Sequence, residues 1–117
     1  MGTLSSDGEA FAVNTFVASG VFSRLFGLSW RKKWMRIEGR EADGIIFPCC
    51  AAIHTFFMFM TIDVIFLDKE KRVVKCVAEV KPWRIALGGI AACTVIELPG
   101  GTLQQHRIQR GCVITFE

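Results

Sequence analysis

Two apolar runs of strand length, residues 61–68 and 72–80, flank a single charged turn, and this pattern constrains the fold more than any other feature of the chain. Every residue of the turn, 68–71, is charged. In the second run, apolar side chains recur at every second position and would share one face of a strand. These are Val74, Cys76, Ala78 and Val80. The sequence therefore predicts an antiparallel hairpin.

Further short runs have the same character, and turn residues separate them at intervals of roughly ten residues. Strands are expected at residues 11–17, 44–47, 54–60, 92–98 and 112–116. A short helix is expected after Ser19, and another after Thr102, where Gln105 three residues later completes a capping-box signature. The pattern predicts an all-β fold, a jelly-roll-like β-sandwich or barrel with one or two short helices.

The length of 117 residues fits one domain. Residues 1–8 are polar and are expected to form a flexible N-terminal tail, with residues 9–117 as a single β-sandwich domain. Residues 45–67 carry almost no charge, but Pro48 and Asp63 interrupt them and their apolar runs have strand length. No membrane span is therefore expected.

Five cysteines, an odd number without a CxxC motif, predict free thiols rather than a disulfide framework. Cys76, Cys93 and Cys112 have apolar neighbours and are expected to be buried. Free thiols fit a reducing compartment, and the opening residues lack a signal peptide, so a cytoplasmic location is expected.

The one basic cluster contains Arg31, Lys32, Lys33 and Arg36, interleaved with Trp30 and Trp34. Such a cluster can contact nucleic acid or phospholipid. A solvated loop with two tryptophans in the core explains it as well, and the net charge of +3 does not demand an anionic partner. We expect no nucleic-acid partner.

Cys49, Cys50 and His54 are plausible zinc ligands, but a structural zinc site needs four. Cys50 and His54 could also form a nucleophile and its base, yet no glycine-rich turn is placed to supply an oxyanion hole. We therefore expect no metal, no cofactor and no catalytic residue.

The polar residues embedded in apolar sequence are the ligand-binding candidates, because burying an unpaired polar group costs several kcal/mol. Asp63 and Glu97 could form a carboxylate pair, or each could bind the guanidinium of Arg84. His54, Thr55, Asp63 and Arg84 are predicted to converge at one end of the sandwich. His54 can join them only if the chain bends between Met58 and Thr61, because positions 54 and 63 differ in parity. The candidates are His54, Thr55, Asp63, Arg84 and Glu97.

Several motifs together resemble the family known as domain of unknown function 192, over roughly residues 10 to 117. They are Cys50-x-x-x-His54-Thr55-x-x-Met58, the run from Ile62 to Asp68, Pro82-x-Arg84, and the run from Val95 to Pro99 with Gly101. The resemblance implies a compact all-β sandwich of the jelly-roll kind and no settled activity. The resemblance also includes Arg24-x-x-Gly27-Leu28, the motif of the N-terminal helix, and Gly111 before the last strand. The chain departs from the family pattern in two places. Cys112 follows Gly111 where the family usually has aspartate, and Ser29-Trp30-Arg31 follows Leu28 where the family usually has glycine-arginine.

The sequence thus favours a binding or accessory module with a small polar pocket for a small molecule, sugar or peptide. The alternative is a small enzyme that uses His54 with Asp63 or Cys50.

Overall fold

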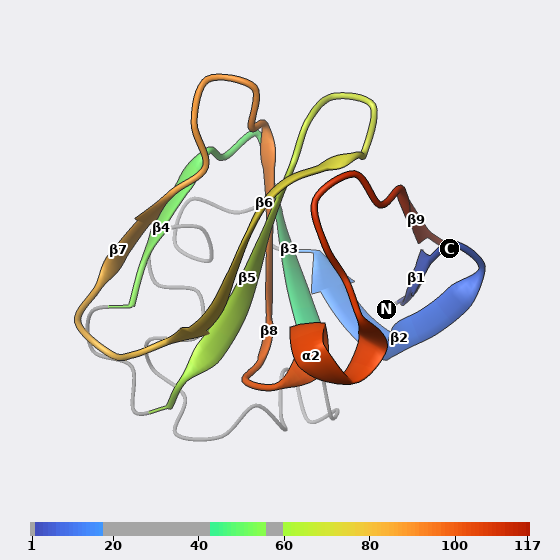
Figure 1. Cartoon of the computed structure of the whole chain (residues 1–117), viewed down its shortest axis with the longest axis horizontal. Helices are drawn as coiled ribbons and strands as arrows, with labels where there is room; N and C mark the ends of the chain where they lie inside the picture. The colour runs from blue at the N-terminus through green and yellow to red at the C-terminus, as the bar shows by residue number, and fades with distance from the viewer. Residues whose placement is uncertain (1, 18–42, 56–59) are drawn as a thin grey trace.

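The computed structural model describes residues 2–17, 43–55 and 60–117, which form nine strands and one short helix (Figure 1). The strands are β1 (Gly2–Ser6), β2 (Glu9–Val17), β3 (Gly44–Pro48), β4 (Ala52–His54), β5 (Ile62–Leu67), β6 (Val73–Val80), β7 (Ile85–Leu87), β8 (Thr94–Pro99) and β9 (Ile114–Phe116), and the helix is α2 (Thr102–His106). The predicted all-β class is confirmed.

Seven of the strands form one curled sheet in the order β6-β5-β8-β3-β2-β1-β9, while β4 and β7 pair as a separate ribbon. The predicted hairpin of β5 and β6 is confirmed, with Ile65 opposite Cys76. All six residues of β5 are buried, and all except Asp63 are apolar, so apolar residues lie on both faces of the strand.

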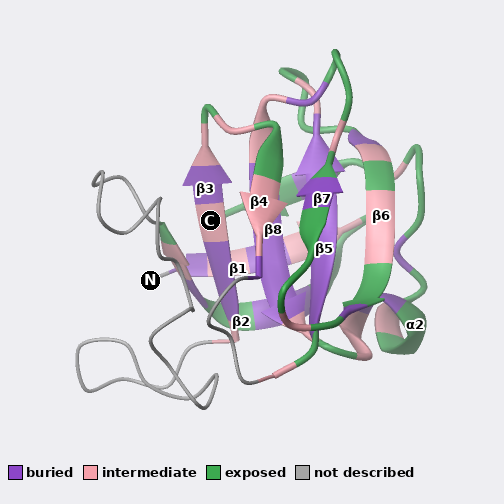
Figure 2. Ribbon diagram, turned by 90° about the vertical axis from the view of Figure 1, so that its left-hand side faces the viewer, coloured by how far each residue is buried: buried purple, intermediate pink, exposed green. Residues whose placement is uncertain are grey.

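The two faces of the curled sheet contact two different cores, and β5, which contributes to both, is buried along its whole length (Figure 2). Ile62, Val64 and Phe66 of β5 point to a core that also contains Ala86 of β7. Ile65 and Leu67 point the other way, into a core that contains Leu103 of α2. The side-chain parity of β5 therefore decides which core each residue joins.

The sheet also curls back on itself. The backbone N–H of Val73 donates to the carbonyl of Cys112 (2.8 Å), and the N–H of Ile114 donates to the carbonyl of Lys71 (2.9 Å). Arg72 and Val113 form an isolated bridge between the same segments. The start of β6 thus meets the chain just before β9, and the curled sheet takes a barrel-like form.

Two expectations need correction. Residues 2–6 are not a flexible tail: they form β1, which pairs with both β2 and β9 and buries Leu4. Of the strand expected at residues 54–60, positions 56–59 lie outside the described residues, and His54 is the last residue of β4. Cys76, Cys93 and Cys112 carry no disulfide, but they are half-buried rather than buried.

Some expectations fall outside the described residues, namely the helix after Ser19, the basic cluster at residues 30–36 and the bend between Met58 and Thr61. The extent of the single domain stays a prediction. Within the described residues, no helix is long and apolar enough to cross a membrane.

Candidate functional site

Strands β6 and β7 follow each other in sequence, with only residues 81–84 between them, but they do not pair. β6 pairs with β5, and β7 pairs with β4 in the other sheet. A connection this short usually closes a hairpin. Here the two strands are splayed apart and belong to different sheets, and among the described residues β7 pairs with β4 alone.

Thr55 holds the connection in its splayed form. Its backbone N–H donates to the carbonyl of Arg84 (2.8 Å), and its own carbonyl accepts from the N–H of Trp83 (2.9 Å). Its hydroxyl donates to the carbonyl of Lys81 (2.7 Å) and accepts from the N–H of Arg84 (2.7 Å). The connection is thereby bonded to the end of β4 and cannot close against β6.

Asp63 fixes the end of β6 from the other side. One carboxylate oxygen accepts from the N–H of Glu79 (2.8 Å), and the other accepts from Gly101 (3.1 Å) and Leu103 (2.9 Å). Asp63 is fully buried, and these three bonds occupy both of its oxygens. It therefore caps the N-terminus of α2 from a distant strand.

This finding corrects the predicted capping box. Thr102 lies inside the first turn of α2, and its hydroxyl donates back to the carbonyl of Pro99 (2.7 Å). The cap position is Gly101, whose backbone is left-handed (φ 97°). The sequence pattern predicts that Thr102 caps the helix locally, whereas in the structure the capping carboxylate is that of Asp63 on β5.

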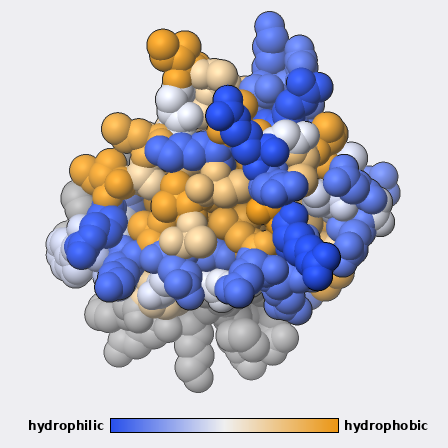
Figure 3. All heavy atoms as spheres, in the orientation of Figure 1, coloured by the Kyte–Doolittle hydropathy of each residue, from blue (hydrophilic) through white to orange (hydrophobic). Residues whose placement is uncertain are grey.

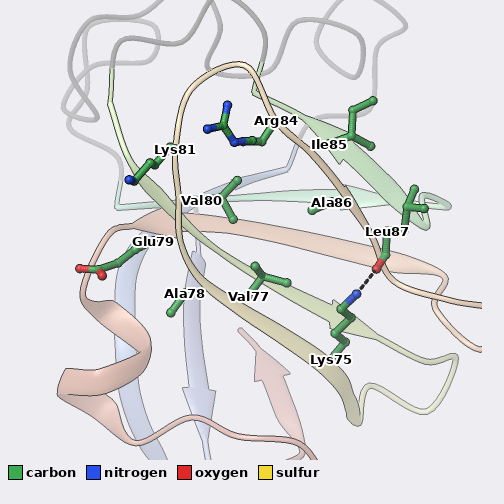
Figure 4. A pocket seen from close by; sticks show the side chains of 10 residues that line it. All are labelled: Lys75, Val77, Ala78, Glu79, Val80, Lys81, Arg84, Ile85, Ala86 and Leu87. Carbon is green, nitrogen blue, oxygen red and sulfur yellow. Dashed lines mark hydrogen bonds between the residues drawn. The ribbon is translucent and has the colours of Figure 1, made fainter.

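The gap between β6 and β7 is an open groove of about 690 Å³ (Figure 4). Val77, Val80 and Ala86 supply apolar lining between the strands. Lys75 spans the groove and donates to the carbonyl of Leu87 (2.7 Å). In the space-filling view, hydrophobic side chains gather on this face and hydrophilic ones surround them (Figure 3). The charged residues that line the groove are Lys75, Glu79, Lys81 and Arg84.

A smaller cleft of about 370 Å³ adjoins the end of the groove. It is lined by Thr61 and Gly100 and shares Glu79 and Lys81 with the groove. The backbone is strained beside this junction, because Glu79 and Trp83 both have positive φ angles, 52° and 63°. The bonds from Asp63 and Thr55 to these segments offset that strain.

The structure brings together some of the predicted residues and not others. Thr55 and Asp63 both bind the backbone of segment 79–84, and Arg84 belongs to it. The guanidinium of Arg84 donates to the carbonyls of Pro82 and Trp83 (3.4 Å each), and among the described residues it forms no ion pair with either carboxylate. Of the five candidates, Arg84 alone lines the groove.

Glu97 lies elsewhere. Its neighbours across the sheet are Ile45 and Val64, and both belong to the core on the β7 side. Asp63 faces the opposite core, so the two carboxylates cannot act as a pair. Oε1 of Glu97 is buried without a hydrogen-bond partner, and burial raises the pKa of this carboxyl to about 8.

His54 ends β4, where it is half-buried and pairs with Ile85 of β7. Residues 54 and 63 are thus in separate sheets, so the parity argument does not apply to them. Cys50 is half-buried and packs against the core on the β7 side. Within the described residues, no three His, Cys, Asp or Glu side chains are grouped closely enough to hold a metal ion.

Residues 2–116 match the family model of domain of unknown function 192, described as uncharacterized ACR. The chain belongs to this family. The UPF0127 protein PH1112 of Pyrococcus horikoshii is 39% identical over 112 residues, which cover 92% of this chain and 87% of that protein. The UPF0127 protein PYRAB11210 of Pyrococcus abyssi is 49% identical over 61 residues, 52% of this chain and 51% of that protein. The latter match thus spans about half of that relative.

The fold also matches a crystal structure of a protein of unknown function from Novosphingobium aromaticivorans. The TM-score is 0.76 at 20% identity, and the match covers 97% of this chain and 82% of that one. At this identity the likeness shows the fold alone. Membership of domain of unknown function 192 therefore establishes a family without an activity.

Proposed function

We propose that this protein is a binding module and that the groove between β6 and β7 takes a ligand with an apolar body and a negative charge. The observation that carries the proposal is the splayed connection. Two consecutive strands are held apart by partly buried hydrogen bonds from Thr55, and an open groove lies between them. Preserving such a gap costs buried apolar contact, which a ligand would restore.

The lining of the groove indicates the character of the ligand. The lining contains three cationic side chains, Lys75, Lys81 and Arg84, and one acidic side chain, Glu79, so its charge is mainly positive. Ile85 and Leu87 of β7 are 63% and 61% exposed, although both are large and apolar. An apolar patch with a charged rim is typical of interaction surfaces.

The enzyme alternative has less support. An acid–base role for Asp63 requires a free carboxylate oxygen, and both of its oxygens accept bonds from backbone N–H groups. Cys50 does not line the groove. A non-catalytic module in the cytoplasm, where the half-buried thiols stay reduced, remains our proposal.

The test is a titration followed by backbone amide NMR. The probes are a sugar acid (glucuronate), an aromatic acid (phenylacetate) and a capped acidic dipeptide (glutamyl-leucine). We expect at least one of them to shift the amides of residues 75–87. Arg84→Gln should weaken that binding, while Arg110→Gln, an exposed arginine outside the groove, should not. Shifts confined to other residues would refute the proposed site.

A further inference from the structure

We infer that the occupant of this groove is an extended acidic peptide segment that adds as a strand between β6 and β7. This inference rests on the proposed function and goes further, because it names the class of partner and the mode of recognition. Strand addition to a sheet edge uses backbone hydrogen bonds for affinity and side-chain pockets at alternate positions for specificity.

The edges supply the backbone groups. β6 is the terminal strand of the seven-stranded sheet, and among the described strands β7 has β4 as its one neighbour. Past its contact with residues 111–113, β6 has no strand beyond it in the part of the chain that the structure describes. An unpaired edge presents N–H and C=O groups ready to bind another chain.

One added strand would occupy the groove in the place that the Lys75 side chain now takes. A strand between two others needs about 9.6 Å between its neighbours, twice the usual spacing of about 4.8 Å. The whole side chain of Lys75 and one hydrogen bond of 2.7 Å span the distance from β6 to the carbonyl of Leu87. That exposed bond is weak and can be exchanged when a ligand enters.

The positive charges along the β6 edge disfavour a second copy of this chain as the occupant of the groove. The β6 edge and its continuation carry Lys75 and Lys81, so two such edges would repel each other. An acidic segment removes that repulsion. Its apolar side chains would pack on Val77 and Ala86, and its carboxylates would point toward Lys81 and Arg84 at the rim.

The adjoining cleft extends the path. It shares Lys81 with the groove and continues past Gly100 and Thr61. A segment that leaves the groove beside Lys81 therefore has a second recess for its terminal residues. This path gives the peptide a defined direction along the molecule.

The experiment uses the full chain and three libraries of capped heptapeptides. In the first, alternate positions are aspartate or glutamate and the others are any apolar residue. The second replaces the acids by lysine or arginine, and the third methylates alternate backbone nitrogens of the first. Binding is measured by calorimetry, and amide hydrogen exchange is followed along β6 and β7.

We expect the acidic library to bind and to slow exchange at the β6 edge, the basic library not to bind, and methylation to weaken binding more than tenfold. The double variant Lys81→Gln, Arg84→Gln should weaken binding more than tenfold as well. The matched control Lys69→Gln, Arg110→Gln removes the same charge from exposed turns and should bind as the unaltered protein does.

Other outcomes separate the two proposals. If methylated and unmethylated libraries bind equally well and shift residues 75–87, strand addition is wrong and the groove still binds ligands. If the acidic library does not bind while glucuronate or phenylacetate does, the peptide is the wrong class of ligand. If peptides and small acids all shift residues outside the groove, both proposals fail. Self-association that blocks peptide binding would identify a second copy as the occupant and overturn this inference.

Discussion

At the scale of single residues, Glu97 is the least typical group of the described chain. It is a buried carboxyl with an unpartnered oxygen, and its pKa is raised to about 8 by desolvation. Between pH 4.5 and about 8 the native protein therefore holds a proton that the unfolded chain has lost. The stability contributed by this group is complete below pH 4.5, falls as the pH rises through that interval, and stays low above it.

Glu97→Gln removes this dependence, because the amide stays neutral. We expect the variant to match the unaltered protein within about 1 kcal/mol at pH 4.5 and to exceed its stability at pH 9 by up to about 5 kcal/mol. Urea unfolding at both pH values measures the difference. Parallel stability curves for the two proteins would show that Glu97 is ionised in the native state.

Thr55 is a second single residue with a testable role, because its hydroxyl makes hydrogen bonds to the connection between β6 and β7 at Lys81 and Arg84. Thr55→Val keeps the shape of the side chain and removes these bonds, leaving the N–H of Arg84 without this acceptor. A loss of about 2–3 kcal/mol in the free energy of unfolding is expected. Thr55→Ser retains the hydroxyl and should cost less than about 1 kcal/mol. A larger loss in Thr55→Ser than in Thr55→Val would mean that the packing of the methyl group matters more than the hydrogen bonds.

At the scale of elements, Asp63 and α2 form a pair that no local pattern reveals. Asp63→Ala should destabilise the protein by about 3–5 kcal/mol, because it leaves three backbone donors without their acceptor. Thr102→Ala removes one hydroxyl bond and should cost about 1 kcal/mol or less. Chemical denaturation compares them, and exchange of the Gly101 and Leu103 amides locates the effect. If Thr102→Ala lowers the free energy of unfolding more than Asp63→Ala does, Thr102 rather than Asp63 is the main cap of α2, as the capping-box signature predicts.

The elements themselves show which parts of the fold the sequence can predict. The hairpin of β5 and β6 follows from two apolar runs and a charged turn, which are local signals. The splay of β6 from β7 depends on Thr55, far away in sequence, and on positive φ angles at Glu79 and Trp83, which side-chain types do not announce. Asp63 and Thr55 were recognisable as buried polar groups that need partners. That their partners are backbone groups of one segment could not be read from their spacing.

At the scale of the whole molecule, the barrel-like form depends on both ends of the chain. β1 lies between β2 and β9, and the segment before β9 meets the start of β6. Residues 1–8 are mostly polar, so their composition predicts a flexible tail. Composition gives no indication that one of them, Leu4, is buried in the core. Leu4 is 1% exposed and packs in the same core as Ile65, Ile96 and Ile114.

The contribution of the first strand is therefore testable with one substitution. Leu4→Ala removes buried methyl groups next to β9 and should destabilise the whole domain by about 3 kcal/mol, with a single cooperative transition. The control is Val13→Ala on the neighbouring strand β2, because Val13 is 57% exposed and its truncation should change stability by about 0.5 kcal/mol or less. Thermal and urea unfolding of both variants give the comparison. If Leu4→Ala is as harmless as Val13→Ala, the first strand does not belong to the cooperative core. If Leu4→Ala lowers the stability by about 3 kcal/mol, the closure of the curled sheet depends on residues that the sequence alone assigns to a tail. The reason is that Leu4 packs in the core and fixes β1 between its two neighbours, β2 and β9.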